Sequence, residues 1–218
     1  MSDIVTFSFG RKQSARVPNK MLRPFADTTL VDIALGKLKT FAPDAFFAGY
    51  EPEFRDKCDH HGVRFVQREE SSINIDGPIT DILSFLRTVD AKYFLLVSAC
   101  NPFLRIDHIN KFLDECRNGH RPAISVKRYH KHFVTPDARG VNFSLETKTL
   151  NNKTVQPIFE LVDGLYFFEK DFFFAEGTYW RWNEVRFLDA SGDDLLIDVD
   201  TEADFAAAQA LWGTGYGR

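Results

Sequence analysis

Four cationic side chains fall within ten residues directly after the first apolar run of the chain. The run IVTFSF (residues 4–9) is typical of a β-strand, and RKQSARVPNK (residues 11–20) follows it with Arg11, Lys12, Arg16 and Lys20. Guanidinium and ammonium groups, together with backbone N–H groups, suit the oxygens of a phosphate. This basic loop (residues 11–20) contains neither GxGxxG nor GxxxxGK[ST]. A solvated surface loop is the alternative interpretation, although the position after the first strand favours a ligand site.

Two aspartates separated by one residue lie near the other end of the chain, in LLIDVD (residues 195–200). If this segment is a strand, Asp198 and Asp200 project to the same side, with Cα atoms about 6.6 Å apart at ~3.3 Å per residue. Two like charges on one face are costly unless a cation lies between them, and Mg²⁺ shared with substrate phosphates would relieve the repulsion. Two exposed carboxylates at the end of a strand are the alternative interpretation. The basic loop and this acidic pair together suit nucleoside triphosphate chemistry in which pyrophosphate leaves.

The other apolar runs are short and alternate with stretches of helical periodicity. Strands are expected at residues 3–9, 45–50, 63–67, 93–99, 123–129, 161–170 and 195–200, and helices at 29–41, 53–62, 78–90, 106–119 and 201–212. This alternation predicts an α/β fold, a three-layer sandwich with a mostly parallel sheet, in a single domain over residues 1–218. The polar stretch 131–160 breaks the rhythm and is expected to form a hairpin or an excursion.

Composition and charge exclude several classes of protein. The formal net charge is -4, so the chain is not expected to bind nucleic acid through its overall field. Three cysteines without a CxxC pair indicate a reducing compartment. The N-terminus lacks the pattern of a signal peptide, and no run approaches the ~18 apolar residues of a membrane span. We therefore expect a cytoplasmic protein without a membrane partner.

Five segments, in this order, resemble the motifs of the acylneuraminate cytidylyltransferases (CMP-sialic acid synthetases), which use CTP to activate acidic sugars. RKQSARVPNKMLRPF is similar to the opening loop R-x-x-S-x-R-[ILV]-P-x-K-N, and VQREE with ITDIL resembles the R-P-E segment and its helix. YFLLVSACNPFLRIDHI resembles the strand ending in T-S-P-x-R, and VQPIFELVDGLYFFEKDFF the segment with N-G-x-x-Y. IDVDTEADFAAAQAL is similar to D-I-D-T-x-x-D-x-x-x-A. The resemblance covers nearly the whole chain and implies a Rossmann-like nucleotidyltransferase domain.

The resemblance also implies a role for each matching residue. Those expected to contact the nucleotide are Arg11, Ser14, Arg16, Lys20, Arg68 and Ser98. Those expected toward the acceptor sugar are Asn101, Arg105, Gln156, Asp163 and Tyr166. Asp198 and Asp200 would hold Mg²⁺, and the catalytic residues would be Arg11, Lys20 and Asp200. The stretch 131–160 would serve homodimerisation and reach toward the partner's site.

Several positions depart from the family pattern. Lys12 and Gln13 replace the usual glycine pair of the first loop, and Ala15 replaces a lysine. Because glycine lets a backbone approach phosphate closely, this loop is expected to depend more on its side chains. Ser98 stands where many members have a glutamine near the cytosine, and Cys100-Asn101-Pro102 replaces T-S-P. The departures bear on the identity of the base and of the sugar.

The expected reaction is transfer of CMP from CTP to an acidic sugar, a nonulosonate such as N-acetylneuraminate or a relative, for surface glycan synthesis. Two alternatives stay open at this point. The Asp198-Val199-Asp200 sequence is formally a DxD motif, which a GT-A-like glycosyltransferase would use to bind a nucleotide sugar. A non-catalytic descendant that only binds nucleotide or only dimerises is the other, because the loop has lost its glycines.

Overall fold

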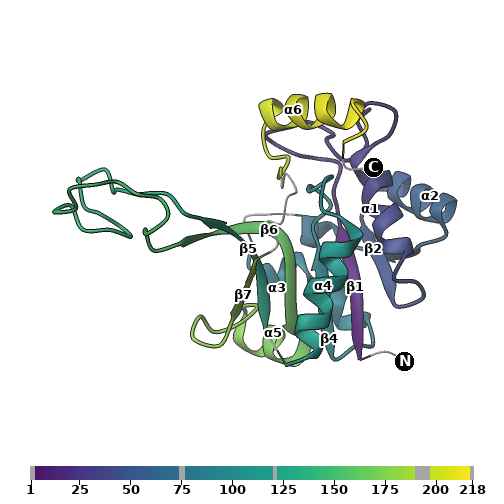
Figure 1. Ribbon diagram of the computed structural model, residues 1–218. Coiled ribbons are helices and arrows are strands. Elements are labelled where there is room, and N and C mark those ends of the chain that lie inside the picture. Colours follow the sequence, from purple (N-terminus) through teal and green to yellow (C-terminus); the bar gives the residue numbers. More distant parts are fainter. Residues whose placement is uncertain (1–2, 74–76, 120–121, 190–196, 217–218) are drawn as a thin grey trace.

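The computed structural model describes residues 3–73, 77–119, 122–189 and 197–216 of the chain. Its helices and strands alternate along the sequence (Figure 1), and their bounds are β1 (Ile4–Phe9), α1 (Leu30–Lys39), β2 (Ala45–Gly49), α2 (Pro52–His61), β3 (Arg64–Gln67), η1 (Glu70–Ile73), α3 (Ile79–Ile82), η2 (Ser84–Thr88), β4 (Tyr93–Val97), α4 (Ile106–Arg117), β5 (Ala123–Tyr129), β6 (Ile158–Glu169), α5 (Lys170–Glu176), β7 (Arg186–Asp189) and α6 (Glu202–Gly213). No helix in these ranges has the length and apolar character needed to cross a membrane.

The strands of the described residues form one seven-stranded sheet in the order β3-β2-β1-β4-β6-β5-β7. The pairs β1–β2, β2–β3, β1–β4 and β5–β7 are parallel. Strand β6 pairs antiparallel with both β4 and β5, so it is the one reversed strand of this sheet. The predicted α/β architecture with a mostly parallel sheet is confirmed.

Helices cover both faces of the sheet, as expected for strands whose side chains are apolar on both sides. On one face, α1, α2 and α4 pack over residues such as Phe47 and Leu95, which are fully buried. On the other face, α3, η2 and α5 cover a cluster of phenylalanine rings from adjacent strands. Phe7 and Phe46 stack with ring centroids 5.5 Å apart, and the ring of Phe94 meets that of Phe7 edge-on at 5.7 Å. This aromatic core fixes the strands whose carboxyl ends carry the candidate site.

Residues 130–157 form a long arm that leaves the body of the molecule between β5 and β6 (Figure 1). Val134 and Gly140 form an isolated antiparallel bridge within it. Four of its large apolar side chains are more than half exposed: Val134, Val141, Leu145 and Leu150. The predicted excursion therefore exists, although residues 158–160 of the predicted stretch belong to β6. Its use in dimerisation stays a prediction.

Helix α6 lies across the carboxyl edge of the sheet (Figure 1). Thr201 is its N-cap, and a capping box joins Thr201 to Asp204. Arg23 anchors the N-terminal loop to this helix: it donates to both carboxylate oxygens of Glu202, at 2.9 and 2.8 Å, and lies 4.0 Å from the ring centroid of Phe205. The first and last segments of the chain are thereby held together.

The predicted final strand at 195–200 is wrong. Residues 197–200 are irregular, and residues 195 and 196 lie outside the described ranges. Val199 is fully buried against α6 and donates its N–H to the carbonyl oxygen of Cys100 at 2.9 Å, so it is a buried anchor and not a residue of a strand. The edge strand β7 comes instead from residues 186–189, whose four residues gave too short a pattern to recognise. The predicted helix 78–90 is divided into α3 and η2.

Candidate active site

Three segments meet beyond the carboxyl ends of β1 and β4, the edge where ligands bind in open α/β sheets. They are the basic loop after β1, residues 98–105 after β4, and the acidic segment (residues 197–200) before α6. The backbone hydrogen bond from Val199 to Cys100 joins the last two. Val17 of the basic loop is fully buried in the same core as Val199 and α6, which fixes the loop against the acidic segment.

Cations of the basic loop reach the acidic segment directly. The Lys20 ammonium donates to the carbonyl oxygen of Val199 at 2.6 Å and lies 3.5 Å from a carboxylate oxygen of Asp200. The Arg16 guanidinium donates to the same carboxylate at 2.9 Å. Two residues of the N-terminal basic loop thus contact Asp200 near the other end of the sequence, which brings the two motifs together.

A bulge in β6 brings a third carboxylate to this edge. The pairing of β5 with β6 shifts between Ile124 and Val126, and the Ser125 hydroxyl holds the bulged strand by donating to Val162 O at 3.2 Å and accepting from Leu165 N at 2.8 Å. The bulged residue Asp163 is exposed. Bulges re-aim side chains at the rims of sheets, and this one places the DGLY sequence at the end of β4.

Asn101 connects the bulge to the acidic segment. Its side chain is buried, and its amide nitrogen donates to the carbonyl oxygen of Asp163 at 2.8 Å. The same nitrogen lies 3.5 Å from a carboxylate oxygen of Asp198. Asp198, Asp200 and Asp163 therefore surround one small region that Lys20 also borders. Although the strand used to derive it is absent, the expected convergence of Asp198 and Asp200 holds, because both flank the buried Val199.

The electrostatics of this region favour a bound cation. Burial, together with the neighbouring carboxylates of Asp200 and Asp163, raises the pKa of Asp198 to about 7 against the smaller opposing effects of Lys20 and Arg16. A carboxyl group in this setting binds a proton, or a metal ion, more readily than a solvated aspartate does.

Lys20 stays charged in this setting. Burial alone would lower its pKa, but the Cys100 sulfur and the carboxylates of Asp200 and Asp198 raise it above its ordinary value. Burial raises the pKa of the Cys100 thiol itself to about 11, so this thiol is neutral at pH 7 and the carboxylates are the effective partners of Lys20. Cys100 was not predicted as a site residue, and a lone cysteine after an apolar strand carries no signal that would have identified it.

Arg68 lies beneath the basic loop. It is 2% exposed, and its guanidinium donates to Gly10 O at 3.0 Å, to the Ser72 hydroxyl at 3.2 Å and to Ser72 O. Burial and the nearby Arg11 lower its pKa to about 10. Arg11 donates to Ile73 O at 2.8 Å. In this structure Arg68 holds the loop from below and Arg11 borders it, and direct contact of either with a nucleotide stays a prediction.

The two serines predicted at the nucleotide shape the backbone near it. The Ser14 hydroxyl accepts from the N–H of Val17 at 3.3 Å, within the basic loop. The Ser98 hydroxyl accepts from the N–H of Cys100 at 3.3 Å, directly after β4. Both hydroxyls lie in the segments that border the carboxylates, and each retains a donor for a ligand.

Tyr166 and Arg105, both predicted toward the acceptor, lie in different places. Tyr166 on β6 is close to the carboxylates, since Asp163 and Asp198 contribute to raising its pKa beyond the effect of burial. Arg105 is the N-cap of α4, forms an ion pair with Asp107 at 3.0 Å, and lines a groove of about 970 Å³ between α1 and α4. The buried Phe103 and Leu104 turn the chain toward that groove. For Arg105, contact with substrate stays a prediction that this placement does not favour.

Gln156 lies on the arm. Its side chain is exposed, and its backbone oxygen accepts from the amide of Asn142 at 2.7 Å. The structure does not bring it to the carboxylates of its own chain. A role in a partner's site, which the resemblance implies, stays a prediction.

The donor set suits a hard divalent cation only together with a ligand. Within the described ranges, no three His, Cys, Asp or Glu side chains are grouped closely enough to hold a metal by themselves. Mg²⁺ is usually bound through one or two carboxylates, with substrate phosphates and water completing its octahedral shell. Asp198 and Asp200 fit this second pattern, in which the ion arrives with the phosphates.

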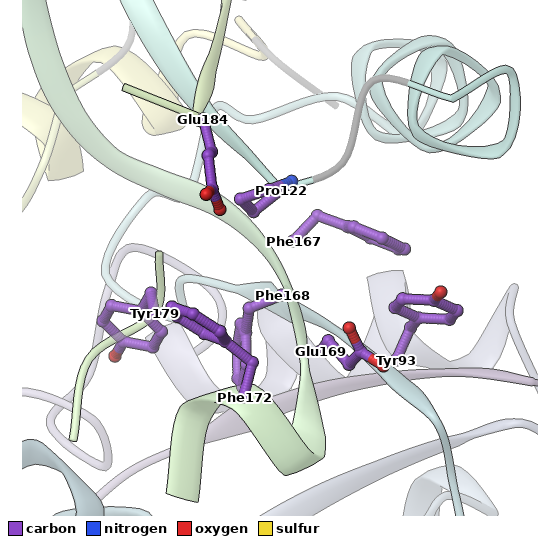
Figure 2. A pocket seen from close by; sticks show the side chains of 8 residues that line it. All are labelled: Tyr93, Pro122, Phe167, Phe168, Glu169, Phe172, Tyr179 and Glu184. Atoms are coloured by element: carbon purple, nitrogen blue, oxygen red, sulfur yellow. The ribbon is translucent and has the colours of Figure 1, made fainter. Parts of the chain in front are cut away.

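A separate cavity of about 260 Å³ lies at the opposite end of the sheet, and Figure 2 shows the side chains that line it. Its lining residues are Tyr93, Pro122, Phe167, Phe168, Glu169, Phe172, Tyr179 and Glu184. Tyr93 begins β4 and Glu169 ends the antiparallel β6, which places the cavity away from the carboxyl ends of the parallel strands. Aromatic rings and two carboxylates form this lining, and none of its described residues is cationic, so it does not suit an anionic nucleotide.

Comparison with protein families identifies a match over most of the chain. Residues 10–159 match the family model described as MobA-like NTP transferase domain. The match begins with the residue before the basic loop and includes the segment after β4. No curated protein sequence matches the chain at a significant level.

Solved structures with the same fold include several nucleotidyltransferases. A CMP:2-keto-3-deoxy-manno-octonic acid synthetase complexed with CTP has a TM-score of 0.70 at 14% identity, covering 98% of this chain and 100% of that one. A 4-diphosphocytidyl-2C-methyl-D-erythritol synthase from Anaerococcus prevotii has a TM-score of 0.65 at 11% identity, covering 96% of each. A putative glucose-1-phosphate thymidylyltransferase from Bacillus anthracis has a TM-score of 0.64 at 13% identity, covering 96% and 95%. At these identities the likeness establishes the fold, which is shared among different named products.

Proposed function

Because the chain belongs to the MobA-like NTP transferase domain family and is a nucleotidyltransferase, we propose that it transfers CMP from CTP to an acidic sugar, giving a CMP-sugar and pyrophosphate. The observation that carries this proposal is the convergence of Lys20, Asp198 and Asp200 at the carboxyl edge of the sheet. The positive charge of Lys20 suits a triphosphate, and the carboxylates of Asp198 and Asp200 suit the cation that accompanies it.

The basic loop would bind the phosphates through side chains. Arg16 and Lys20 lie at its end nearest the carboxylates, and Arg11 lies at its start. Arg16 is two-thirds exposed, so it can exchange Asp200 for a phosphate oxygen at little cost, since surface ion pairs contribute about 0–1 kcal/mol. Arg68 beneath the loop would keep its backbone in place while these side chains engage the ligand.

Asp198 and Asp200 would hold Mg²⁺ together with phosphate oxygens of the substrate. The ion would neutralise charge on the triphosphate and on the pyrophosphate that leaves. It would also relieve the mutual repulsion of the two carboxylates. Asn101 would keep the Asp198 carboxylate in place by donating to it.

In the proposed reaction, a hydroxyl oxygen of the acceptor attacks the α-phosphorus of CTP in line. The new bond joins that oxygen to the α-phosphorus, the bond from the α-phosphorus to the oxygen bridging to the β-phosphate breaks, and the hydroxyl proton passes to solvent. Lys20 and Arg11 would stabilise the charge that develops on pyrophosphate, and the loop would fix the triphosphate for in-line attack.

CTP and an acidic acceptor are the finer parts of the proposal. They are supported by the resemblance to acylneuraminate cytidylyltransferases and by the shared fold with the CMP:2-keto-3-deoxy-manno-octonic acid synthetase. The family membership bears out the broader nucleotidyltransferase activity. A sialic acid or another nonulosonate is the acceptor that the sequence motifs favour, and Asp163 with Tyr166 would face it from the bulge of β6.

A homodimer joined by the arm completes the proposal. The arm exposes four large apolar side chains, Val134, Val141, Leu145 and Leu150, which a second subunit would cover. Gln156 at the base of the arm would then lie near the partner's site, as the resemblance implies.

The proposal is tested by measuring pyrophosphate release with Mg²⁺, each of the four nucleoside triphosphates and a panel of acidic sugars that includes nonulosonates and 3-deoxy-octulosonate. Release with CTP and one sugar, abolished by Asp200→Asn, is the expected result. Release with another triphosphate would correct the base, and release with a neutral sugar phosphate would correct the acceptor. Consumption of a nucleotide sugar without pyrophosphate release would favour the glycosyltransferase alternative and overturn the proposal.

A further inference from the structure

A lysine is buried on the sheet-facing side of α1, outside the residues that the motifs select. Lys37 is 9% exposed, and its ammonium donates to the carbonyl oxygen of Asn101 at 2.6 Å and to that of Pro102 at 3.0 Å. In the described part of the chain, no carboxylate forms an ion pair with it. Burial lowers the pKa of Lys37 to about 7, as expected for an ammonium whose partners are neutral.

The two carbonyls that Lys37 holds belong to the segment that positions the carboxylates. Asn101 donates from its side chain to Asp163 O at 2.8 Å, and the same nitrogen lies 3.5 Å from Asp198. Cys100, one residue earlier, accepts from Val199 of the acidic segment. Lys37 is therefore linked to Asp198 through one residue, with each contact made by a buried group.

The place of Lys37 in α1 argues against a role in packing alone. Leu30, Ala34 and Leu38 are buried on the same side of this helix, so an apolar residue would suit this position. Burying an amine costs free energy that burying an apolar side chain would not. The two hydrogen bonds of the Lys37 ammonium go to backbone carbonyl oxygens, one to Asn101 and one to Pro102. What it gains is a fixed backbone at the end of β4, because Lys37 supplies a donor to Pro102 O and a second donor to Asn101 O, which also accepts from the N–H of Leu104 at 3.3 Å.

We infer that Lys37 is a positioning residue for the nucleotidyl transfer proposed above, acting through the backbone of Asn101 and Pro102 on the Asp198 carboxylate. It does not touch the reacting atoms. Without its two hydrogen bonds, Asn101 would no longer be held in register with Asp163 and Asp198. This inference rests on the proposed function only for its consequence in catalysis, whereas the backbone contact is a property of the structure.

The kinetic test compares Lys37→Met with Lys39→Met, since Lys39 is an exposed lysine on the same helix. Lys37→Met is expected to lower kcat by about 10- to 100-fold, the scale of a misplaced catalytic group, with the KM for CTP changed by less than about twofold. Lys39→Met is expected to leave both unchanged. Circular dichroism establishes that each variant is folded, and if Lys37→Met does not fold, Lys37→Gln replaces it.

A double-mutant comparison separates positioning from a general loosening of the fold. In the Asn101→Ala background, Lys37→Met is expected to have almost no further effect on kcat, because the side-chain amide that links residue 101 to Asp198 is gone. Independent effects that multiply would overturn the inference. An unchanged kcat in folded Lys37→Met would overturn it as well.

A thiol measurement tests the contact without any enzyme activity. Cys58 and Cys116 are fully buried, whereas Cys100 is partly exposed as a residue, although burial raises the pKa of its thiol to about 11. Ellman's reagent should therefore label Cys100 slowly in wild type, and Cys100→Ser should remove the signal. Lys37→Met is expected to raise the labelling rate several-fold over wild type, and Lys39→Met is not. Equal rates in all three proteins would overturn the inference. If the wild type releases no pyrophosphate with any substrate, the proposed function fails, and the labelling rates still decide the role of Lys37.

Discussion

Replacing Asp198 by asparagine is predicted to abolish activity and, at neutral pH, to stabilise the fold. Asp198 lies partly buried beside two other carboxylates, Asp200 and Asp163, and these surroundings raise its pKa from 3.8 to about 7. A carboxylate held ionised in such a place opposes folding. Asparagine keeps the shape and the contact with Asn101, and it removes the charge.

The size of the effect follows from the pKa. A shift of about 3 units corresponds to about 4 kcal/mol at 1.36 kcal/mol per unit, which is an upper bound. Because Asp198 is partly exposed, solvent screening reduces the expected gain to about 2 kcal/mol. For a chain of this length, that gain corresponds to about 4–8 °C in Tm.

The gain must depend on pH in a defined direction. The folded protein binds the Asp198 proton more tightly than the unfolded chain does, so the penalty is absent below the unfolded pKa near 3.8. It grows as the pH rises through this range and is complete above about 7. Asp198→Asn should therefore match wild type at pH 4 and exceed it in stability at pH 8.

Urea denaturation at the two pH values, in the presence of EDTA, measures this difference. Asp107→Asn is the matched control, because Asp107 is an exposed carboxylate paired with an arginine, and it should change stability by less than about 0.5 kcal/mol. A loss of stability in Asp198→Asn at pH 8, or an equal gain at both pH values, would show that an ionised Asp198 does not oppose folding.

Three further predictions concern the fold and the assembly. Gly49→Ala should destabilise the protein by about 2–3 kcal/mol in urea denaturation, because the new Cβ would lie 2.8 Å from a phenylalanine side chain of α2. At Gly36 a new Cβ meets nothing within 4 Å, so Gly36→Ala should stabilise α1 by about 0.5–1 kcal/mol, and equal effects of the two substitutions would contradict the packing at Gly49. Arg68→Met should lower the free energy of unfolding by about 3 kcal/mol in the same assay, since several backbone oxygens lose a charged donor. An unchanged urea midpoint would show that these hydrogen bonds do not stabilise the loop. The double variant Leu145→Asp and Leu150→Asp should sediment as a monomer at a concentration where wild type is a dimer; a wild-type monomer would disprove the arm-mediated assembly.

The sequence predicted most of the sheet because its strands are short apolar runs bounded by polar residues. The run at 93–97 is buried on both faces in the structure, as its composition indicates. The error at 197–200 has a physical origin: the apolar residues before Asp198 suggest a strand, whereas the described residues 197–200 are irregular and Val199 is anchored beneath α6. A pattern of apolar residues alone does not distinguish a side chain that anchors an irregular segment from one that belongs to a hydrogen-bonded strand.

The candidate site was predictable where charge and spacing both contribute. The two ends of the site, with Lys20 from the basic loop and Asp200 from the acidic segment, were identified from residue types, and the structure brings them within 3.5 Å. Arg105 was predicted toward the acceptor from the resemblance of its segment to T-S-P-x-R, but the buried residues between Asn101 and Arg105 direct it to the groove beside α4. Lys37 did leave a signal, since a lysine in register with Leu30 and Ala34 on an apolar helix face requires an explanation.

The central claim is that the chain transfers a nucleotidyl group by attack at the α-phosphorus, and labelled CTP tests it most directly. The protein is incubated with Mg²⁺, the acidic sugar panel, and CTP labelled with ³²P at either the α or the γ position. The α label is expected in a CMP-sugar and the γ label in pyrophosphate, and both transfers should be lost in Asp200→Asn. Transfer of the γ label to an acceptor, or no transfer of either label while a supplied CMP-sugar is consumed, would contradict it.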